Sequence, residues 1–535
     1  MESKTEAKIR QITDDYRASK IGKADLINAI SPQELNAFLL PSVNPKSVSN
    51  IESAQTGLSC SNGAAVGRVF FSTASLLKAY NQSKGTKEDH RFILIQEVTY
   101  ANDVRAIELG QGVITSSGGY SSHAPVIARS LGKPAAVLPG IEFHPDHIII
   151  EGHKLCEGEY ITIDIHQNPV IYFGKGTVVP PSPDNKILCD YLKEIQCFSG
   201  EIKVMANIDS SSDVELAKQF GSAGIGLCRT EHMFLRQDRI QLIRSLLKTD
   251  SSEVDPKIED QVGAFLKAEF KNLIAGMSPL PITIRLLDAP IHEFFSGAEE
   301  DSPISPEVNP LMGNRGCRIA ITHPHIYELQ VHSILEAAFS CSKEVSEAID
   351  IRIMVPMIGS EREFATIKNG KKLVGASVPG IEGIVEKLRT KYDLEELPFQ
   401  LKIGTMIELP SAALSAGEIS RQAEFISFGT NDLTQLVLGI SRDDIHSFLP
   451  AYTKMDIWRT DPFQKIEQPV KDLISFAIRT SKLTRPDIEV GVCGEQATNV
   501  SDLAFFRNAG VDYLSCSPYA IPSVILGMAQ EKLKD

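Results

Sequence analysis

From about residue 199 to the C-terminus, short apolar runs alternate with segments whose apolar residues recur at helical spacing. Two of these helical segments are Val214–Phe220 and Ile326–Ser340. A strand-then-helix repeat of this length is typical of a closed (β/α)₈ barrel, and the pattern alone also allows a doubly wound open sheet. The eight expected strands are Ile202–Ile208, Gly224–Cys228, Ile282–Leu287, Ile351–Met357, Leu401–Ile407, Phe425–Phe428, Ile488–Cys493 and Val511–Cys516.

Between about Ser47 and Gly174 the pattern changes to short strands separated by glycine-containing turns. The helical segments Asp103–Leu109 and Val126–Leu131 lie between some of these strands. A stretch of this size can fold independently, so we expect a compact mixed β/α domain. Its expected strands are Val66–Phe71, Phe92–Gln96, Gly112–Thr115, Ala135–Val137, His147–Ile150, Tyr160–Ile163 and Val170–Tyr172.

Residues 1–45 place apolar side chains at helical spacing, and Ser31 with Glu34 has the pattern of a helix N-cap. This arm is too short to be a domain, so we expect it to pack on the part of the chain after it. The prolines of residues 180–183 indicate a stiff, extended linker and therefore a movable domain before it. The expected parts are a helical connecting arm (1–45), a movable domain (46–175), a linker (176–198) and a barrel (199–535).

Composition narrows the possible partners and compartment. The 535 residues are 42% hydrophobic and 23% charged, which is typical of a soluble globular protein with two or three domains. A formal net charge of −14 argues against broad binding to nucleic acid or membrane surfaces, so an anionic substrate would need locally concentrated arginines. The N-terminus is acidic and polar, no stretch is apolar enough to span a membrane, and the nine cysteines are scattered. We therefore expect a cytoplasmic protein with reduced thiols that binds neither nucleic acid nor membrane.

His123 follows a turn that contains Gly118 and Gly119. Ser121 or Ser122 can cap a helix that begins near residue 124. The imidazole would then lie at a helix N-terminus, where backbone N–H groups and the helix dipole favour an anion. A histidine that carries a phosphoryl group would benefit from this setting, so we interpret His123 as functional rather than structural.

Several of the expected barrel strands end in polar residues. In a barrel, the carboxyl ends of all strands surround one cavity. Arginines there suit bidentate recognition of phosphate or carboxylate, a Glu–Asp pair supplies the hard oxygen ligands that Mg²⁺ prefers, and a thiol can act as an acid or base. Each residue alone also has a structural explanation, but their coincidence on five strand ends favours the barrel and a site. These residues are Arg229, Arg285, Glu408, Asn431 with Asp432, and Cys493.

These stretches resemble the motifs of the phosphoenolpyruvate-utilising enzymes, and in particular the pyruvate phosphate dikinase family. Residues 118–129 are similar to the phosphohistidine motif. The resemblance runs from about residue 20 to the C-terminus, and it implies a (β/α)₈ TIM barrel preceded by a small swivelling phosphohistidine β/α domain. The further matching stretches are Gly224–Phe234, Thr283–Asp288, Asn309–Arg318, Gly404–Glu408, Ser427–Gln435, Val492–Glu495 and Ser515–Pro518.

The resemblance implies a role for each matching residue. His123 would carry the phosphoryl group, and Cys493 would protonate the enolate to give pyruvate. Glu408 and Asp432 would hold the Mg²⁺ cofactor. The implied activity is a phosphotransferase that interconverts phosphoenolpyruvate and pyruvate, and the implied assembly is a homodimer through the barrel. The residues implied to bind the substrate are Arg229, Arg285, Arg315, Asn431 and Thr430.

The chain also departs from the family pattern. No stretch resembles the family's nucleotide-binding, ATP-grasp domain, and only Lys20–Ile27 resembles the segment that connects it to the histidine domain. Ser121 stands where the family usually has threonine, and residues 496–498 are Gln-Ala-Thr where the family usually has His-Gly-Gly. The stretch between residues 294 and 309 is shorter than in the dikinase. Because the catalytic set is intact, these departures concern the partner and the regulation.

Three functions remain open at this point. The first two are phosphotransferases whose second phosphoryl partner is another chain. This partner would be either a separate ATP-grasp subunit or a small phosphocarrier protein, as in the sugar-transport phosphotransferase. The carrier ranks lower, because residues 1–45 are too short for the carrier-docking domain of that enzyme. The third possibility is a non-catalytic protein that responds to phosphoenolpyruvate or pyruvate. Cys493 argues against it, since binding alone needs no proton donor.

Overall fold

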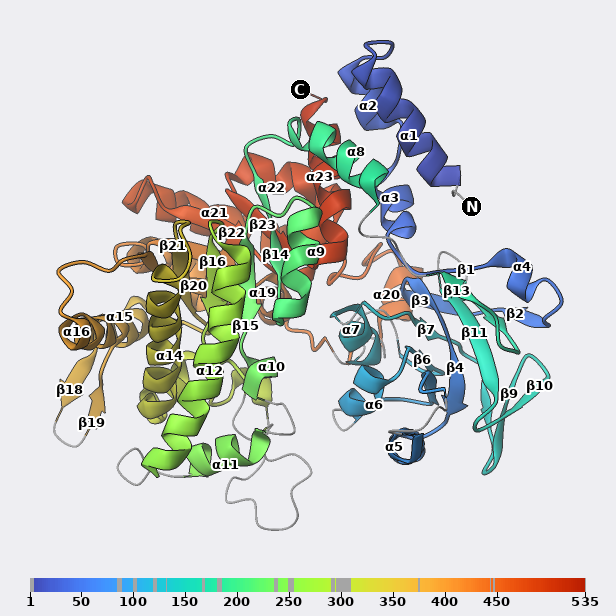
Figure 1. Cartoon of the computed structure of the whole chain (residues 1–535), viewed down its shortest axis with the longest axis horizontal. Coiled ribbons are helices and arrows are strands. Elements are labelled where there is room, and N and C mark those ends of the chain that lie inside the picture. The colour runs from blue at the N-terminus through green and yellow to red at the C-terminus, as the bar shows by residue number, and fades with distance from the viewer. Residues whose placement is uncertain are drawn as a thin grey trace. The chain divides into compact units, whose positions relative to one another are not determined.

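The computed structural model covers the whole chain and divides it into two compact units (Figure 1). One unit is Met1–Tyr191 with Ile440–Phe463, and the other is Leu192–Gly439 with Gln464–Asp535. The structure describes residues 4–83, 89–99, 103–118, 123–130, 132–165, 169–179, 185–234, 239–248, 255–289, 294, 309–373, 376–442, 444–445 and 448–534.

The N-terminal arm is helical and packs on the helix that follows the sheet domain. Asn185 donates to Glu6 (2.8 Å), and the Tyr191 hydroxyl donates to the carbonyl of Leu26. The predicted cap at Ser31 is confirmed, because its hydroxyl accepts from the Glu34 N–H while the Glu34 carboxylate accepts from the Ser31 N–H. The helices are α1 (Lys4–Arg17), α2 (Lys23–Asn28), α3 (Pro32–Phe38) and α8 (Lys186–Gln196).

An eight-stranded sheet forms the centre of this unit, in the order β2-β12-β11-β4-β5-β6-β7-β3. Strands β4 to β7 are parallel, and the outer pairs are antiparallel. The strands are β2 (Ser53–Gln55), β3 (Leu58–Ser61), β4 (Gly63–Phe70), β5 (Phe92–Gln96), β6 (Gly112–Thr115), β7 (Ala135–Val137), β11 (Tyr160–Ile165) and β12 (Val170–Tyr172). A smaller antiparallel sheet contains β8 (Glu142–Phe143), β9 (His147–Ile150) and β10 (His153–Cys156). The other helices of this unit before residue 185 are α4 (Pro45–Val48), α5 (Thr73–Ser83), α6 (Val104–Leu109) and α7 (His123–Ser130).

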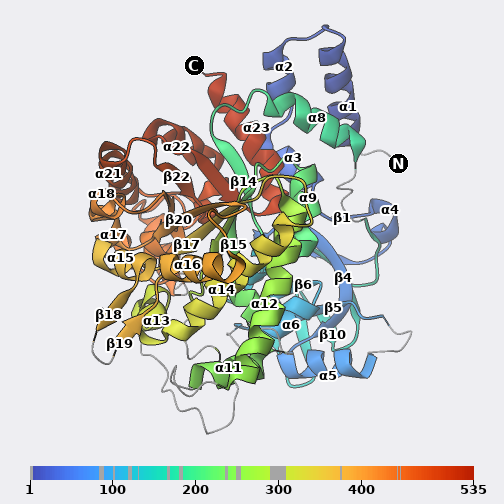
Figure 2. The ribbon, with the colours of Figure 1, turned by 60° about the vertical axis from the view of Figure 1, so that its left-hand side comes forward.

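The second unit is the predicted (β/α)₈ barrel. Strand β23 pairs with β14 in parallel, which closes the sheet and excludes the open-sheet alternative. Figure 2 shows helices α12, α14 and α16 outside the strands. The strands in barrel order are β14 (Lys203–Asn207), β15 (Ile225–Arg229), β16 (Ile282–Arg285), β17 (Asp350–Val355), β20 (Gln400–Ile407), β21 (Phe425–Phe428), β22 (Glu489–Val492) and β23 (Tyr513–Cys516).

Each expected barrel strand is found, with ends that differ by a few residues from the prediction. One or more helices follow each strand in chain order. The α-helices are α9 (Val214–Gln219), α10 (Glu231–Phe234), α11 (Ile240–Lys248), α12 (Pro256–Met277), α13 (Cys317–Thr322), α14 (Pro324–Ser342), α15 (Glu361–Asn369), α16 (Ile381–Tyr392), α17 (Pro410–Leu414), α18 (Ala416–Ile419), α19 (Thr430–Leu438), α21 (Gln468–Thr484), α22 (Leu503–Ala509) and α23 (Ile521–Lys532). A hairpin of β18 (Lys371–Leu373) and β19 (Ala376–Val378) separates α15 from α16.

The structure corrects two of the expected boundaries. Val178–Val179, expected in an extended linker, forms β13 and pairs with β1 (Ser42–Val43) at the end of the arm. Residues 440–463, expected in the barrel, group with the N-terminal unit and contain α20 (Leu449–Lys454). Both differences depend on contacts between residues far apart in sequence, which a local pattern does not report.

Candidate functional site

The polar residues that end the barrel strands meet at one end of the barrel. Arg229 and Arg285 are the last residues of β15 and β16, and Glu408 directly follows β20. Asp432 lies in the first turn of α19, just after β21, and Cys493 directly follows β22. Because the strands are parallel, these positions share the carboxyl face of the barrel. The structure thus brings together the barrel residues that the sequence indicated.

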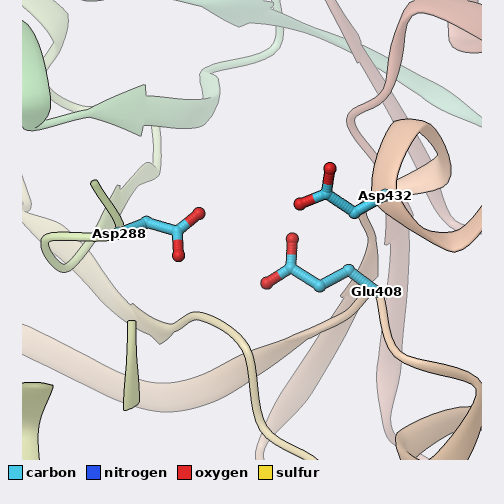
Figure 3. Close-up of side chains that lie close together, drawn as sticks. All are labelled: Asp288, Glu408 and Asp432. Atoms are coloured by element: carbon cyan, nitrogen blue, oxygen red, sulfur yellow. The ribbon is translucent and has the colours of Figure 1, made fainter. Parts of the chain in front are cut away.

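Three carboxylates on this face lie close enough to share one cation. Asp288, Glu408 and Asp432 each offer an oxygen, and these oxygens all lie within 4.8 Å of one another. Figure 3 shows Asp288 on the opposite side from Glu408 and Asp432, with all three carboxylates facing the space between them. Asp288 and Glu408 are 1% exposed. Glu408 and Asp432 are the predicted metal ligands, and the structure places Asp288 beside them as a third carboxylate.

Two largely buried arginines, whose side chains are 12% and 14% exposed, contact Asp288. The Arg285 guanidinium contacts Asp288 at 3.0 Å and Glu231 at 3.3 Å. Arg315 donates to the Asp288 carboxylate at 2.6 Å and contacts Asp432 at 3.3 Å. Burial lowers the pKa of each guanidinium, but attraction to these carboxylates outweighs the burial and raises both pKa values. Both arginines therefore stay charged beside the carboxylates.

The barrel wall holds the Arg285–Asp288 segment in place. The Asp288 N–H donates to the Glu231 carboxylate at 2.8 Å. On α14, the buried Gln330 accepts from the Leu287 N–H at 3.0 Å, and the Tyr327 hydroxyl donates to the Leu287 carbonyl at 2.6 Å. These bonds fix the backbone between Arg285 and Asp288. The position of Asp288, three residues after the arginine at the end of β16, is the sequence signal for its part in the site.

Glu408 is the carboxylate of the cluster whose pKa is raised. One of its oxygens accepts from the Met357 N–H at 2.6 Å. Burial, followed by repulsion from Asp288 and Asp432, raises the pKa of Glu408 to about 8. A third carboxylate is therefore costly to ionise here until a cation neutralises it. The hard oxygen donors and the excess of negative charge fit Mg²⁺.

Cys493 is buried at the end of β22, beside the charged cluster. Its thiol packs with Leu227, Met354, Met406 and Phe425, which come from strands on different sides of the barrel and meet in its interior. Burial raises the pKa of the Cys493 thiol, which is 2% exposed, above its usual value. The thiol is thus protonated at neutral pH, which is the state that a proton donor requires.

The structure gives the remaining predicted substrate residues different surroundings. Arg229 is partly buried, and its guanidinium makes no hydrogen bond or ion pair with the residues that the structure describes. Asn431 accepts from the Glu495 N–H at 3.1 Å. Thr430 is fully buried, and its hydroxyl donates to Gln496. The role of each of these three residues in substrate binding stays a prediction.

His123 lies in the N-terminal unit and begins α7, as the sequence predicted for a helix starting near residue 124. Gly118 has φ of +112°, which agrees with the expected glycine turn. Ser121 and Ser122 lie outside the described residues, so their capping role stays a prediction, and so does the phosphoryl-carrier role of His123.

Comparison with known proteins decides the family. Residues 191–533 match the protein family described as "PEP-utilising enzyme, PEP-binding domain". Residues 88–167 match the family described as "PEP-utilising enzyme, mobile domain". The chain belongs to the PEP-utilising enzymes. The first match covers the barrel, and the second covers the part of the N-terminal unit that contains His123.

The curated relatives include pyruvate, phosphate dikinases. The protein of this name from Treponema pallidum is 38% identical over 98% of this chain and 61% of its own length. Pyruvate, phosphate dikinase 1, chloroplastic, from Arabidopsis thaliana is 36% identical over 95% of this chain and 53% of its own length. The protein from Rickettsia prowazekii is 35% identical over 96% of this chain and 58% of its own length. The chain thus spans between about half and three fifths of these relatives.

Two further observations concern the cysteines and the helices. All nine cysteines lie in the described part of the chain, and none of them forms a disulfide there. None of the described helices combines the length and the apolar character that a bilayer crossing needs.

Proposed function

We propose that this chain catalyses phosphoryl transfer between phosphoenolpyruvate and His123, with release of pyruvate. The observation that carries the proposal is the set of two charged arginines and three carboxylates on the barrel face, beside a protonated buried thiol. The matches to the PEP-binding and mobile domains, and the dikinase relatives, support the same reaction.

The proposed reaction assigns each group a step. The bond between phosphorus and the enol oxygen breaks, and a bond forms between phosphorus and an imidazole nitrogen of His123. Arg285 and Arg315 stabilise the charge of the moving phosphoryl group. The enolate carbon takes the proton of the Cys493 thiol, which gives pyruvate, and the thiolate regains a proton from water.

Glu408, Asp432 and Asp288 would hold Mg²⁺, which would neutralise carboxylate charge and polarise substrate oxygens. In the described structure Asp288 occupies N–H groups of both arginines, so the substrate phosphate competes with it for them. Arg229 makes no ion pair with the described residues and is proposed as a further phosphate ligand. Asn431 and Thr430 complete the proposed substrate site.

The test uses purified protein, Mg²⁺ and labelled pyruvate without nucleotide. Label should pass into phosphoenolpyruvate, and incubation with phosphoenolpyruvate should leave an acid-labile phosphate on the His123 peptide. A stable phosphoserine on residues 121–122 would overturn the carrier assignment. A protein that binds phosphoenolpyruvate but shows neither exchange nor phosphohistidine would instead support the non-catalytic, regulatory function.

A Cys493→Ala variant separates the two chemical steps. Phosphohistidine should still form from phosphoenolpyruvate, because the thiol acts on carbon and not on phosphorus. Proton exchange at the pyruvate methyl group should fall by ~10²–10⁴-fold, as expected for loss of a positioned acid. Exchange at the parent rate would show that the thiol is structural.

The second phosphoryl partner is proposed to be a separate ATP-grasp subunit, with a small phosphocarrier protein as the alternative. The proposal predicts that the purified chain is not phosphorylated by labelled ATP alone, and that one of these partners restores transfer. A homodimer through the barrel and a cytoplasmic location are also proposed. Analytical ultracentrifugation tests the dimer.

A further inference from the structure

The residue three positions after Cys493 is a buried glutamine, Gln496. Gln496 lies in a 3₁₀ turn, Glu495–Thr498, and is 0% exposed. A glutamine side chain is rarely buried unless its amide is hydrogen-bonded. The partners of this amide therefore indicate what the residue does.

The Gln496 amide bridges two hydroxyl groups on the helix that carries the metal ligand. Its Oε1 accepts from the Thr430 hydroxyl at 2.6 Å, and its Nε2 donates to the Thr434 hydroxyl at 3.4 Å. Thr430 and Thr434 are both fully buried, and they lie one turn apart on the same face of α19. A neutral amide suits this bridge because its oxygen accepts and its NH2 group donates, and no charge is buried.

The first turn of α19 is also packed closely on both sides. A Cβ added to Gly494 would lie 1.9 Å from the Thr430 hydroxyl, so the chain after Cys493 directly contacts this turn. A Cβ added to Gly429 would lie 3.0 Å from the carboxylate of Glu408. A shift of α19 would therefore change both the separation of Asp432 from Glu408 and its separation from Cys493.

We infer that Gln496 is a positioning residue that fixes the first turn of α19, and with it Asp432 and Asn431, relative to Glu408 and Cys493. The Glu495 N–H bond to Asn431 joins the same two segments one residue earlier. Gln496 acts through these residues and not on the substrate. This inference rests on the proposed function in assigning Asp432 to the metal.

The first experiment measures binding of Mn²⁺ alone to the full chain. Gln496→Met keeps the length and apolar bulk of the side chain but removes both hydrogen bonds. Mn²⁺ affinity should fall by about 10-fold, as is typical when a group that orients a metal ligand is lost. A folded Gln496→Met variant that binds Mn²⁺ with the parent dissociation constant would overturn the inference.

A control variant separates positioning from general loss of stability. Glu336 lies on α14, where Lys267, Lys391 and Tyr392 donate to it, and it contacts none of the site residues described above. Glu336→Gln should lower the melting temperature and leave the Mn²⁺ affinity unchanged. If this control loses Mn²⁺ affinity to the same extent as Gln496→Met, the inference fails.

Two further variants test whether the hydrogen bonds are responsible. Gln496→His also offers one acceptor and one donor, so it should bind Mn²⁺ more tightly than Gln496→Met; equal affinities would count against the bridge. Thr434→Val removes one hydroxyl with little change of shape and covers the case in which Gln496→Met does not fold. Thr434→Val should weaken Mn²⁺ binding less than Gln496→Met does. An unchanged affinity would contradict the bridge.

Failure of this inference is distinguishable from failure of the proposed function. If the parent protein shows no exchange between pyruvate and phosphoenolpyruvate, the proposed function fails, while the Mn²⁺ measurements still test Gln496. If the parent is active, Gln496→Met at saturating Mg²⁺ should also lower the rate of proton exchange at the pyruvate methyl group. An unchanged rate would contradict the placement of Asn431 and Asp432 relative to Cys493.

Discussion

Arg352 and Arg285 are both arginines of barrel strands with little exposure, but they lie at opposite ends of the barrel and have different partners. Arg352 is near the start of β17, and it contacts Glu489 at 2.7 Å and Asp350 at 3.3 Å. Lys402 contacts Glu489 as well, so this cluster pairs two cations with two carboxylates. At the carboxyl face, Arg285 and Arg315 face four carboxylates, those of Glu231, Asp288, Glu408 and Asp432.

The pKa values of the two glutamates in these clusters shift in opposite directions. Burial raises the pKa of Glu489, but attraction to Arg352 and Lys402 outweighs the burial and lowers its pKa overall. Burial and repulsion raise the pKa of Glu408 to about 8. In a balanced cluster each carboxylate has a cation beside it, so removal of one charge destabilises the fold. The excess of carboxylates around Arg285 and Arg315 instead favours the binding of a further cation. Burial of charge alone therefore does not distinguish a structural ion-pair cluster from a binding site. The balance between positive and negative charges does distinguish them.

Replacing Arg352 by Met should have the largest effect on stability. The change leaves the partly buried carboxylates of Asp350 and Glu489 without their main cation, which costs about 3–5 kcal/mol in the free energy of unfolding. Urea denaturation measures this loss. The affinity of the folded variant for Mg²⁺ should equal that of the parent, and a matching loss of Mg²⁺ affinity would break the distinction between the two ends.

Replacing Arg285 by Met should act on chemistry. Loss of this guanidinium should slow formation of phosphohistidine from phosphoenolpyruvate by ~10²–10³-fold, because charge stabilisation of the phosphoryl group is lost. Quenched-flow measurement of acid-labile phosphate, normalised to folded protein, reports the rate. Arg352→Met is the control and should form phosphohistidine at the parent rate. Equal rates in the parent and Arg285→Met would remove Arg285 from the proposed site.

The pH dependence of Mg²⁺ binding sharpens the comparison. The pKa of Glu408 is about 8 when folded and has an ordinary value of 4.5, so its contribution to stability is present at low pH and lost as pH rises through about 8. Because Mg²⁺ binds the ionised form, its affinity should rise about tenfold from roughly pH 7 to pH 9. Calorimetry at the two pH values measures the change, and Mg²⁺ should also raise the melting temperature more at the higher pH. Affinity independent of pH would show that Glu408 is not a ligand.

Lys402→Met should have the smallest effect. The Lys402 side chain is 37% exposed, so solvent screens its 3.3 Å contact with Glu489. We expect a loss of ~0.2–1 kcal/mol in the free energy of unfolding by urea denaturation. A loss as large as that of Arg352→Met would mean that the balance of the amino-end cluster depends on both cations equally.

The sequence by itself determined the barrel strands and the residues that end them. Each strand is a short apolar run, and burial on both faces requires this pattern wherever the strand lies. Arg285, Glu408, Asp432 and Cys493 were found because parallel strands bring their carboxyl ends to one face, so order along the chain predicts proximity. The cap at Ser31 was found because it is a contact between residues three positions apart.

Only the tertiary structure decided how these residues are partnered. Asp288 joins the carboxylate cluster, and Gln496 bridges Thr430 and Thr434, through contacts that no local spacing specifies. The pairing of β13 with β1 likewise joins segments more than a hundred residues apart. A one-dimensional pattern reports whether a position is buried, whereas the balance of charge around a buried group depends on which distant side chains reach it. This balance distinguishes Glu408 from Glu489, and it follows from closure of the barrel.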